Sequence, residues 1–113
     1  MTKIYHNPRC TKSREVLQFL KDKKESIEEV LYMQSHPTLE ELQELLTLLN
    51  KKPKDLVRTK ETLWKEKYKD KNLSGKRLLN ILSKNPQLIE RPIVIKNGKA
   101  VIARPTELVK EIL

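Results

Sequence analysis

The sequence contains a single cysteine, and this scarcity limits the chemistry that the chain can perform. One cysteine cannot form an internal disulfide, so any disulfide must be made with another molecule. Ser13 follows Cys10 in the spacing C-x-x-S, which excludes the C-x-x-C dithiol of a self-contained disulfide exchanger. The phosphatase-like loop C-x₅-R is also excluded, because Val16 occupies the position of its arginine. No cluster of Cys and His has the spacing of zinc ligands, and we expect no bound metal and no bound cofactor.

Long apolar runs are absent as well. No stretch approaches the roughly 20 residues that span a bilayer. The N-terminal MTKIYHNP also lacks the apolar centre of a signal peptide. We therefore expect a cytoplasmic protein without membrane contact. Its 113 residues are enough for one domain with an ordinary core, and we expect a monomer.

Charge, in contrast, is abundant and unevenly placed. The net charge is +9, and residues 51–84 alone carry 12 basic and 4 acidic side chains. Such a field attracts small anions or acidic partners and could support loose contact with nucleic acid. Trp64 and Tyr68 are the only aromatic residues in this region, at the spacing i, i+4, so a nucleic-acid-binding module is a minor alternative. The role of the basic region is left open by the sequence.

The N-terminal half predicts a parallel β-α-β unit followed by a helix. KIYH alternates apolar and polar residues, residues 13–20 have the apolar spacing of an amphipathic helix, and residues 27–33 favour a second strand. Thr38 has Glu41 three positions later, as in a capping box. Leucines then recur on one face from residue 39 to residue 49, which predicts a helix there.

The C-terminal half predicts short helices and then a hairpin. Residues 53–57 can open a short helix with proline in its first turn, and residues 74–84 predict another helix. Apolar runs at 92–95 and 100–103 flank Asn97-Gly98, the dipeptide that type I′ hairpins prefer. A terminal helix follows from Thr106 to Leu113. The order predicts an α/β fold: a four-stranded mixed sheet with flanking helices and a helical insertion.

The predicted elements place Cys10 between the first strand and the first helix. Unpaired backbone N–H groups and the helix dipole favour an anion at that position, and a thiolate is such an anion. Arg9, Lys12 and Arg14 add positive charge, and His6 stands at the end of the strand. We expect these groups to lower the pKa of Cys10, with His6 and the neighbouring cations as the main side-chain contributors.

Four motifs together resemble a known family. HNPRCTKSR is similar to the H-N-P-x-C-x-x-S-R signature of glutaredoxin-coupled arsenate reductases, which have a thioredoxin-like fold with a helical insertion. LVRTK (56–60), ERPIVI (90–95) and ARPTE (103–107) follow in the family's order. The resemblance covers nearly all of the chain and implies a single thioredoxin-like arsenate reductase domain over residues 1–113.

The resemblance also implies roles for eight residues. Cys10 matches the nucleophile that attacks arsenate. The residues that match the first motif and would support the thiolate are His6, Ser13 and Arg14. The arginines that match those around the bound oxyanion are Arg58, Arg91 and Arg104. Pro92 matches the cis-proline that faces the active-site loop.

The same resemblance implies the partners of the reaction. Because the chain has no second cysteine, glutathione would serve as co-substrate and glutaredoxin would remove it from the enzyme. Thr11-Lys12 stands where the well-studied enzymes often have Gly-Thr, which leaves the efficiency and the physiological substrate open. Two alternatives remain: a Spx-type redox regulator that binds RNA polymerase and typically uses C-x-x-C, or a related thiol protein with another substrate.

Overall fold

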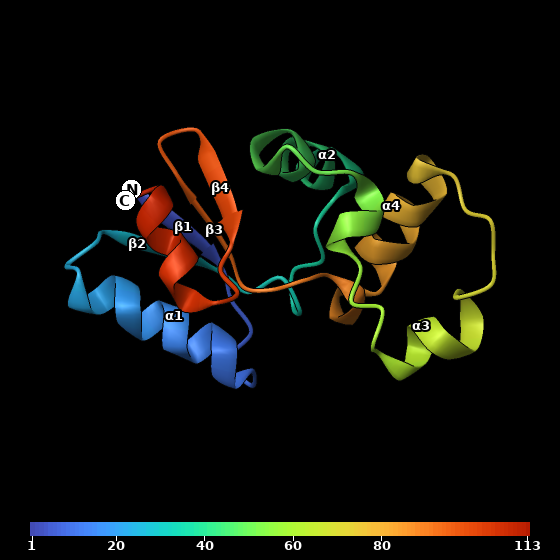
Figure 1. Cartoon of the computed structure of the whole chain (residues 1–113), viewed down its shortest axis with the longest axis horizontal. Helices are drawn as coiled ribbons and strands as arrows, with labels where there is room; N and C mark the ends of the chain where they lie inside the picture. The colour runs from blue at the N-terminus through green and yellow to red at the C-terminus, as the bar shows by residue number, and fades with distance from the viewer. The chain divides into compact units, whose positions relative to one another are not determined.

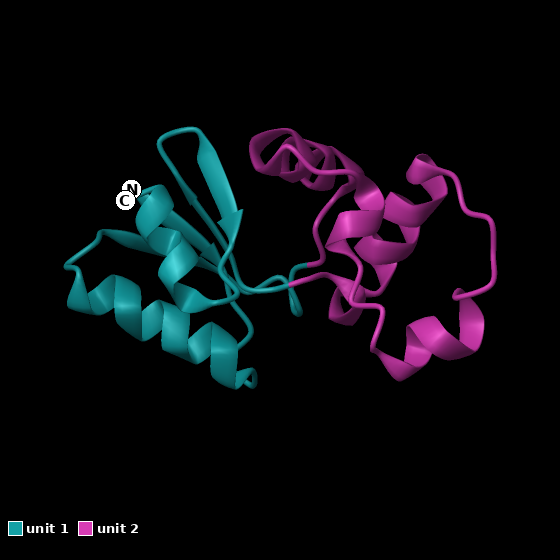
Figure 2. Ribbon diagram, viewed as in Figure 1, with its two compact units in different colours: residues 1–35, 91–113 teal, residues 36–90 magenta.

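The computed structural model describes all 113 residues and divides the chain into two compact units (Figure 1, Figure 2). Unit 1 comprises residues 1–35 and 91–113, and unit 2 comprises residues 36–90. All four strands belong to unit 1, whereas unit 2 is helical and is inserted in the sequence between the second strand and the third. The predicted helical insertion is therefore confirmed. That the whole chain acts as one domain stays a prediction.

The sheet of unit 1 has the strand order β2-β1-β3-β4. Its strands are β1 (Thr2–Tyr5), β2 (Ile27–Val30), β3 (Ile93–Lys96) and β4 (Lys99–Ile102). β1 pairs with β2 in parallel and with β3 antiparallel, and β3 and β4 form an antiparallel hairpin. The predicted α/β class with a four-stranded mixed sheet is confirmed. β2 is shorter than the predicted 27–33, because the chain turns after Val30 and the Gln34 N–H donates to the Leu31 carbonyl at 3.0 Å.

The turn between β3 and β4 is set by two residues with positive φ. Asn97 has φ 53° and Gly98 has φ 73°, which are the left-handed conformations that a type I′ turn requires at both central positions. Asparagine and glycine tolerate this region better than other residues. The Asn97-Gly98 dipeptide therefore predicted the hairpin correctly.

One face of the sheet is covered by α1 (Thr11–Asp22) and the 3₁₀ helix η3 (Thr106–Glu111). The helix α1 contributes Val16 and Leu20, which are fully buried against Ile4 of β1. The rest of this core comprises Val94, Ala103 and Val109. The predicted terminal helix exists, but it takes the tighter 3₁₀ form and ends at Glu111.

Two capped helices organise unit 2. α2 (Leu39–Leu49) begins with a full capping box, in which the Glu41 N–H donates to Thr38 Oγ1 at 3.1 Å and the Thr38 N–H donates to Glu41 Oε1 at 3.3 Å. α4 (Gly75–Lys84) begins at Ser74, whose hydroxyl accepts from the Arg77 N–H at 3.2 Å. The apolar faces that the leucine spacing predicted are buried in both helices.

Shorter helices complete unit 2. They are η1 (Pro53–Leu56), α3 (Thr62–Lys67) and η2 (Pro86–Leu88). The sequence did not predict α3, since only Leu63 and Trp64 of its six residues are apolar. Trp64 is buried, and its ring centroid lies 5.8 Å from that of Tyr68. The indole thus belongs to the core of unit 2 and is not an exposed stacking surface for bases. None of the helices has the length and apolar character needed to cross a membrane.

Candidate active site

The loop between β1 and α1 presents Cys10 at the start of the helix. Cys10 is the N-cap residue, with an extended backbone conformation of φ −95° and ψ 121°. Its N–H donates to the Asn7 carbonyl at 2.9 Å, and its carbonyl accepts from the Arg14 N–H at 3.0 Å. No side chain caps this helix. The first-turn N–H groups are thus available to the half-buried Cys10 sulfur, as the sequence predicted.

Three donors surround that sulfur. Burial alone would raise the pKa of the Cys10 thiol, but hydrogen bonds outweigh it and the pKa is lowered. The backbone N–H of Ser13 and the side chain of Arg91 are the main donors, and the backbone N–H of Lys12 adds to them. Hydrogen bonds to the charged form favour ionisation, and the charge of Arg91 acts in the same direction. The arrangement therefore favours a thiolate at Cys10.

A buried hydrogen-bond network around the Ser13 hydroxyl holds the cysteine loop in place. His6 Nδ1 and Ser13 Oγ share a hydrogen bond of 2.6 Å, and the Asn7 N–H donates to the same hydroxyl at 3.0 Å. His6 is 3% exposed and Ser13 is fully buried. Burial lowers the pKa of His6; Glu29 opposes this, whereas Lys21 and Arg14 reinforce it. A neutral imidazole here supports the thiolate indirectly, by fixing the residue whose N–H reaches the sulfur.

The cations next to Cys10 in the sequence have other partners. The Arg14 guanidinium donates to the Pro8 carbonyl at 2.9 Å and to Thr11 Oγ1 at 3.3 Å. The Lys12 ammonium lies 3.6 Å from Glu15 on the exposed side of α1. Neither side chain contributes to the lowered pKa of Cys10. This differs from the expectation that the neighbouring cations activate the thiol, because side chains at a helix start can point along the helix or back over the loop and need not reach the sulfur.

Arg91 and Arg104 flank the hairpin in unit 1. The Arg91–Pro92 and Arg104–Pro105 peptide bonds are both cis. The Ala103 N–H donates to the Pro92 carbonyl at 2.8 Å, which brings the two segments side by side. Besides its contact with Cys10, Arg91 has buried Nε and Nη1 atoms without a hydrogen-bond partner. The Arg104 side chain is exposed.

Arg58 belongs to unit 2. Its Nη1 donates to Glu61 Oε1 at 3.1 Å, and its Nε lies 3.7 Å from Glu90 Oε1. The structure therefore surrounds this arginine with carboxylates of its own unit. Its predicted contact with an oxyanion stays a prediction of the resemblance.

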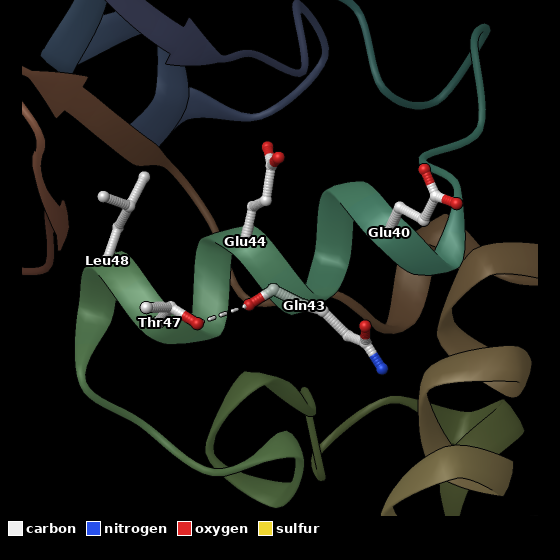
Figure 3. A pocket seen from close by; sticks show the side chains of 5 residues that line it. All are labelled: Glu40, Gln43, Glu44, Thr47 and Leu48. Carbon is white, nitrogen blue, oxygen red and sulfur yellow. Dashed lines mark hydrogen bonds between the residues drawn. The ribbon is translucent and has the colours of Figure 1, made fainter.

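A hollow of about 570 Å³ lies along α2 and does not fit the predicted chemistry (Figure 3). It is lined by Glu40, Gln43, Glu44, Thr47 and Leu48. The lining offers two carboxylates and neither a cation nor a nucleophile. An anionic substrate would be repelled there, so Cys10 is the better candidate for the reacting group.

Known proteins resemble the chain along almost its whole length. A model described as the ArsC family matches residues 5–112. The chain belongs to the ArsC family. It is 47% identical over 113 residues to the Escherichia coli K12 protein YfgD, an uncharacterized protein, with 98% of this chain and 95% of that protein covered. It is 40% identical over 113 residues to an arsenate reductase of Neisseria meningitidis serogroup A, covering 98% and 97%.

Solved structures of ArsC relatives have the same fold. The structure of an arsenate reductase from Vibrio cholerae matches with a TM-score of 0.94 and 41% identity, covering 99% of this chain and 97% of that one. The thioredoxin-like class that the resemblance implied is confirmed. Within this ArsC chain, Ser13 and Arg91 lower the pKa of Cys10, and Ser13 shares a hydrogen bond with His6. The Arg14 side chain bonds instead to Pro8 and Thr11. Asn7, which was not among the predicted site residues, also shapes the loop.

The sequence contains a signal for the structural role of Asn7. Its Oδ1 accepts from the Arg9 N–H at 3.1 Å, its carbonyl accepts from Cys10, and its N–H donates to Ser13. Asparagine before proline favours such turns, because its side chain bonds to the backbone two residues on. The dipeptide Asn7-Pro8 thus indicates a turn that shapes the cysteine loop.

Proposed function

We propose that this ArsC-family chain is an arsenate reductase with Cys10 as its nucleophile. The Cys10 thiolate attacks arsenic, a sulfur–arsenic bond forms, and one arsenate oxygen leaves as water after protonation. Glutathione then contributes the second sulfur, and arsenic takes up two electrons and departs as arsenite. Cys10 is left in a mixed disulfide with glutathione, which glutaredoxin removes.

The hydrogen bonds to the Cys10 sulfur carry this proposal. A thiolate is the nucleophilic form of cysteine, and the donors from Ser13, Lys12 and Arg91 favour it. Attack on an oxyanion brings two negative charges together, so a cation at the sulfur lowers the cost of that approach. Arg91 meets this need at the reacting atom.

Arg91 has donors left for the substrate. Its buried Nε and Nη1 have no partner, and buried polar groups of this kind are normally paired. Arginine presents planar, paired donors that match a tetrahedral oxyanion. We assign these donors to arsenate oxygens, and Arg58 and Arg104 stay predicted members of the same set. The N. meningitidis and V. cholerae relatives are both named arsenate reductases, which supports arsenate as the substrate.

The need for an external reductant follows from the single cysteine. Cys10 is the only thiol, and Ser13 at the C-x-x-S position is engaged by His6 and Asn7. No second sulfur can resolve an adduct within the chain. Glutathione with glutaredoxin supplies it, and the same absence disfavours a Spx-type C-x-x-C sensor.

A coupled assay tests the proposal. The protein with arsenate, glutathione and glutaredoxin should form arsenite, whereas thioredoxin without glutathione should sustain little turnover. Cys10→Ser should abolish turnover and keep the fold by circular dichroism. Absence of arsenite formation by the wild-type protein, or equal turnover with thioredoxin alone, would reject the proposed reaction or its proposed reductant.

A further inference from the structure

A large block of unpaired positive charge lies in unit 2. Residues 51–84 carry 12 basic side chains, and among them only Arg58 forms an ion pair. The others are all exposed. Three carboxylates that could offset this charge have other contacts: Glu61 and Glu90 both contact Arg58, and the Asp55 carboxylate accepts from the Lys52 N–H at 2.9 Å. Unit 2 therefore keeps a positive field that attracts acidic partners.

Two adjoining hollows lie in unit 2, where α2 packs against α4 (Figure 2). The first has a volume of about 510 Å³, and its lining includes Gln43, Leu46, Pro53, Lys76 and Leu79. The second has a volume of about 300 Å³ and is lined by Leu39, Ser74, Lys76, Arg77 and Asn80. Because Lys76 lines both hollows, they adjoin, and we call them together the α2–α4 groove.

The α2–α4 groove combines apolar side chains with free cations. Leu46 and Leu79, which line it, are 9% and 4% exposed, so they form an apolar floor. Lys76 and Arg77 are exposed, and neither side chain forms an ion pair within the chain. No carboxylate lines either hollow. The groove therefore suits a ligand that carries carboxylates next to an apolar group.

Two side-chain amides line the groove from its two helices. They are Gln43 of α2 and Asn80 of α4, both exposed and without a side-chain hydrogen bond in the chain. In Figure 3 the Gln43 side chain points to the side of α2 opposite Glu44, so the amide lies away from that carboxylate. An amide offers donors and an acceptor, which match the C=O and N–H groups of a peptide backbone.

The lining disfavours two other classes of ligand. Single-stranded nucleic acid binds through the stacking of bases on aromatic rings. The only aromatic residues of unit 2 are Trp64 and Tyr68, and neither lines the groove. A small inorganic anion would use the cations but neither the apolar floor nor the amides. A peptide segment uses all three features.

We propose that the α2–α4 groove docks an acidic segment of a partner protein. Carboxylates of the segment contact Lys76 and Arg77, and an apolar side chain between them packs on Leu46 and Leu79. The two amides bond to the backbone of the segment. This docking site is separate from the reaction at Cys10 and does not depend on arsenate as the substrate.

A binding titration with a defined probe tests the proposal. The fluorescein-labelled peptide Glu-Glu-Leu-Glu-Glu is titrated with the full-length protein, and binding is followed by fluorescence anisotropy. Lys76→Glu/Arg77→Glu should weaken binding about tenfold or more, because like charges then face each other. The reversal should keep the fold by circular dichroism, since both positions lie in the first turn of α4, where the helix dipole favours acidic residues.

Lys65→Glu/Lys67→Glu is the matched control. It changes the net charge by the same amount on α3, and neither lysine lines the groove or forms an ion pair. The control should weaken binding about twofold at most, through the general field alone. A loss equal to that of the α4 variant would overturn the proposal, because any reduction in positive charge would then be sufficient.

Two further measurements test the apolar floor. The peptide Glu-Glu-Ser-Glu-Glu keeps the charge and should bind about fivefold more weakly, because it has no apolar side chain to bury. In NMR spectra the backbone N–H signals of Gly75 and Leu79 should shift when the leucine peptide is added. Gln43→Ala/Asn80→Ala should weaken the binding of both peptides. Equal affinities for the two peptides, or shifts confined to residues outside the groove, would contradict the proposed docking mode.

Other occupants would give different results with the same proteins. A single-stranded oligouridine that binds more tightly than the peptide, and loses its affinity in Lys76→Glu/Arg77→Glu, would assign the groove to nucleic acid. Self-association of the wild-type protein in sedimentation experiments that this variant abolishes would assign it to a second copy of the chain. Either result would overturn the proposal, as would the absence of peptide binding at millimolar concentration.

Discussion

Arg91 lowers the pKa of the Cys10 thiol, both as a hydrogen-bond donor and by its charge, although the two residues lie near opposite ends of the sequence. The contact is possible because β1 and β3 are neighbours in the sheet, so that the residues at the end of one strand and before the other share an edge. The guanidinium thus has two tasks in the account given above. It favours the thiolate, and its remaining donors are assigned to the oxyanion.

Replacing Arg91 should separate this contact from the effect of the neighbouring cations. Arg91→Ala should raise the pH midpoint of Cys10 alkylation by neutral iodoacetamide, because the thiolate loses a charged donor. Arg14→Ala is the control and should leave the midpoint in place, since the Arg14 side chain bonds to Pro8 and Thr11. A midpoint that moves with Arg14 and not with Arg91 would contradict the assignment.

Arsenate turnover should respond more strongly to Arg91 than alkylation does. Loss of a charged hydrogen bond costs about 1.5–3 kcal/mol, so Arg91→Ala should lower kcat/KM for arsenate about tenfold to more than a hundredfold. Iodoacetamide presents no oxyanion, so its rate at a pH where Cys10 is fully ionised should be nearly unchanged. Equal losses in both reactions would limit Arg91 to activation of the thiol.

The buried serine should matter for stability. Ser13→Ala leaves His6 Nδ1 and the Asn7 N–H without their shared partner, and a buried group that loses its partner costs about 1–3 kcal/mol. Urea denaturation should show a free energy of unfolding that is lower by this amount. Ser35→Ala, at an exposed position whose side chain makes no hydrogen bond, should change it little. Equal stability of the two variants would count against the network.

His6 should make stability fall on the acid side of neutrality. Its pKa is lowered in the folded state by burial, so below the unfolded value of about 6.5 the unfolded chain binds a proton that the folded chain does not. Stability is fully present above that pH and is lost as the pH falls through the folded value. His6→Gln should flatten this part of the curve in urea titrations at several pH values, and His36→Gln, at an exposed position, should not. A wild-type curve without this slope would be inconsistent with a buried neutral imidazole.

A second acid-sensitive contact is formed by Glu25, which links two strands of the sheet. Glu25 accepts from the Lys96 ammonium and from Thr2 Oγ1, and these bonds lower the pKa of its carboxyl. The stabilisation is present above the unfolded value of about 4.3 and is lost as the pH falls through the folded value. Lys96→Met should therefore make the loss of stability below this pH shallower. Lys99→Met is the control in the same hairpin, and the account requires that it keep the wild-type slope.

Local sequence was sufficient for most of the elements. Thr38 with Glu41 marked the start of α2, and Asn97-Gly98 marked the hairpin, because caps and type I′ turns depend on residues within a few positions. The short helix α3 escaped prediction, since six residues give too little apolar periodicity to read. The position of Cys10 at a helix start was also predictable for the same local reason.

The partners of the cysteine were less predictable. Arg9, Lys12 and Arg14 are close in sequence, but their distance to the sulfur depends on side-chain directions that a sequence does not give. Arg91 reaches Cys10 only through strand pairing, so no local pattern could reveal it. The resemblance placed Arg91 near the oxyanion, and the structure adds its contact with the thiolate.

Intact-mass measurement of the protein tests the central claim most directly. The protein is incubated with arsenate and reduced glutathione but without glutaredoxin, so that the last step cannot proceed. The account predicts that one glutathione becomes bound through a disulfide to Cys10, that it appears only when arsenate is present, and that added glutaredoxin removes it. No adduct, or an adduct that forms equally well without arsenate, would contradict the claim that Cys10 reduces arsenate with glutathione.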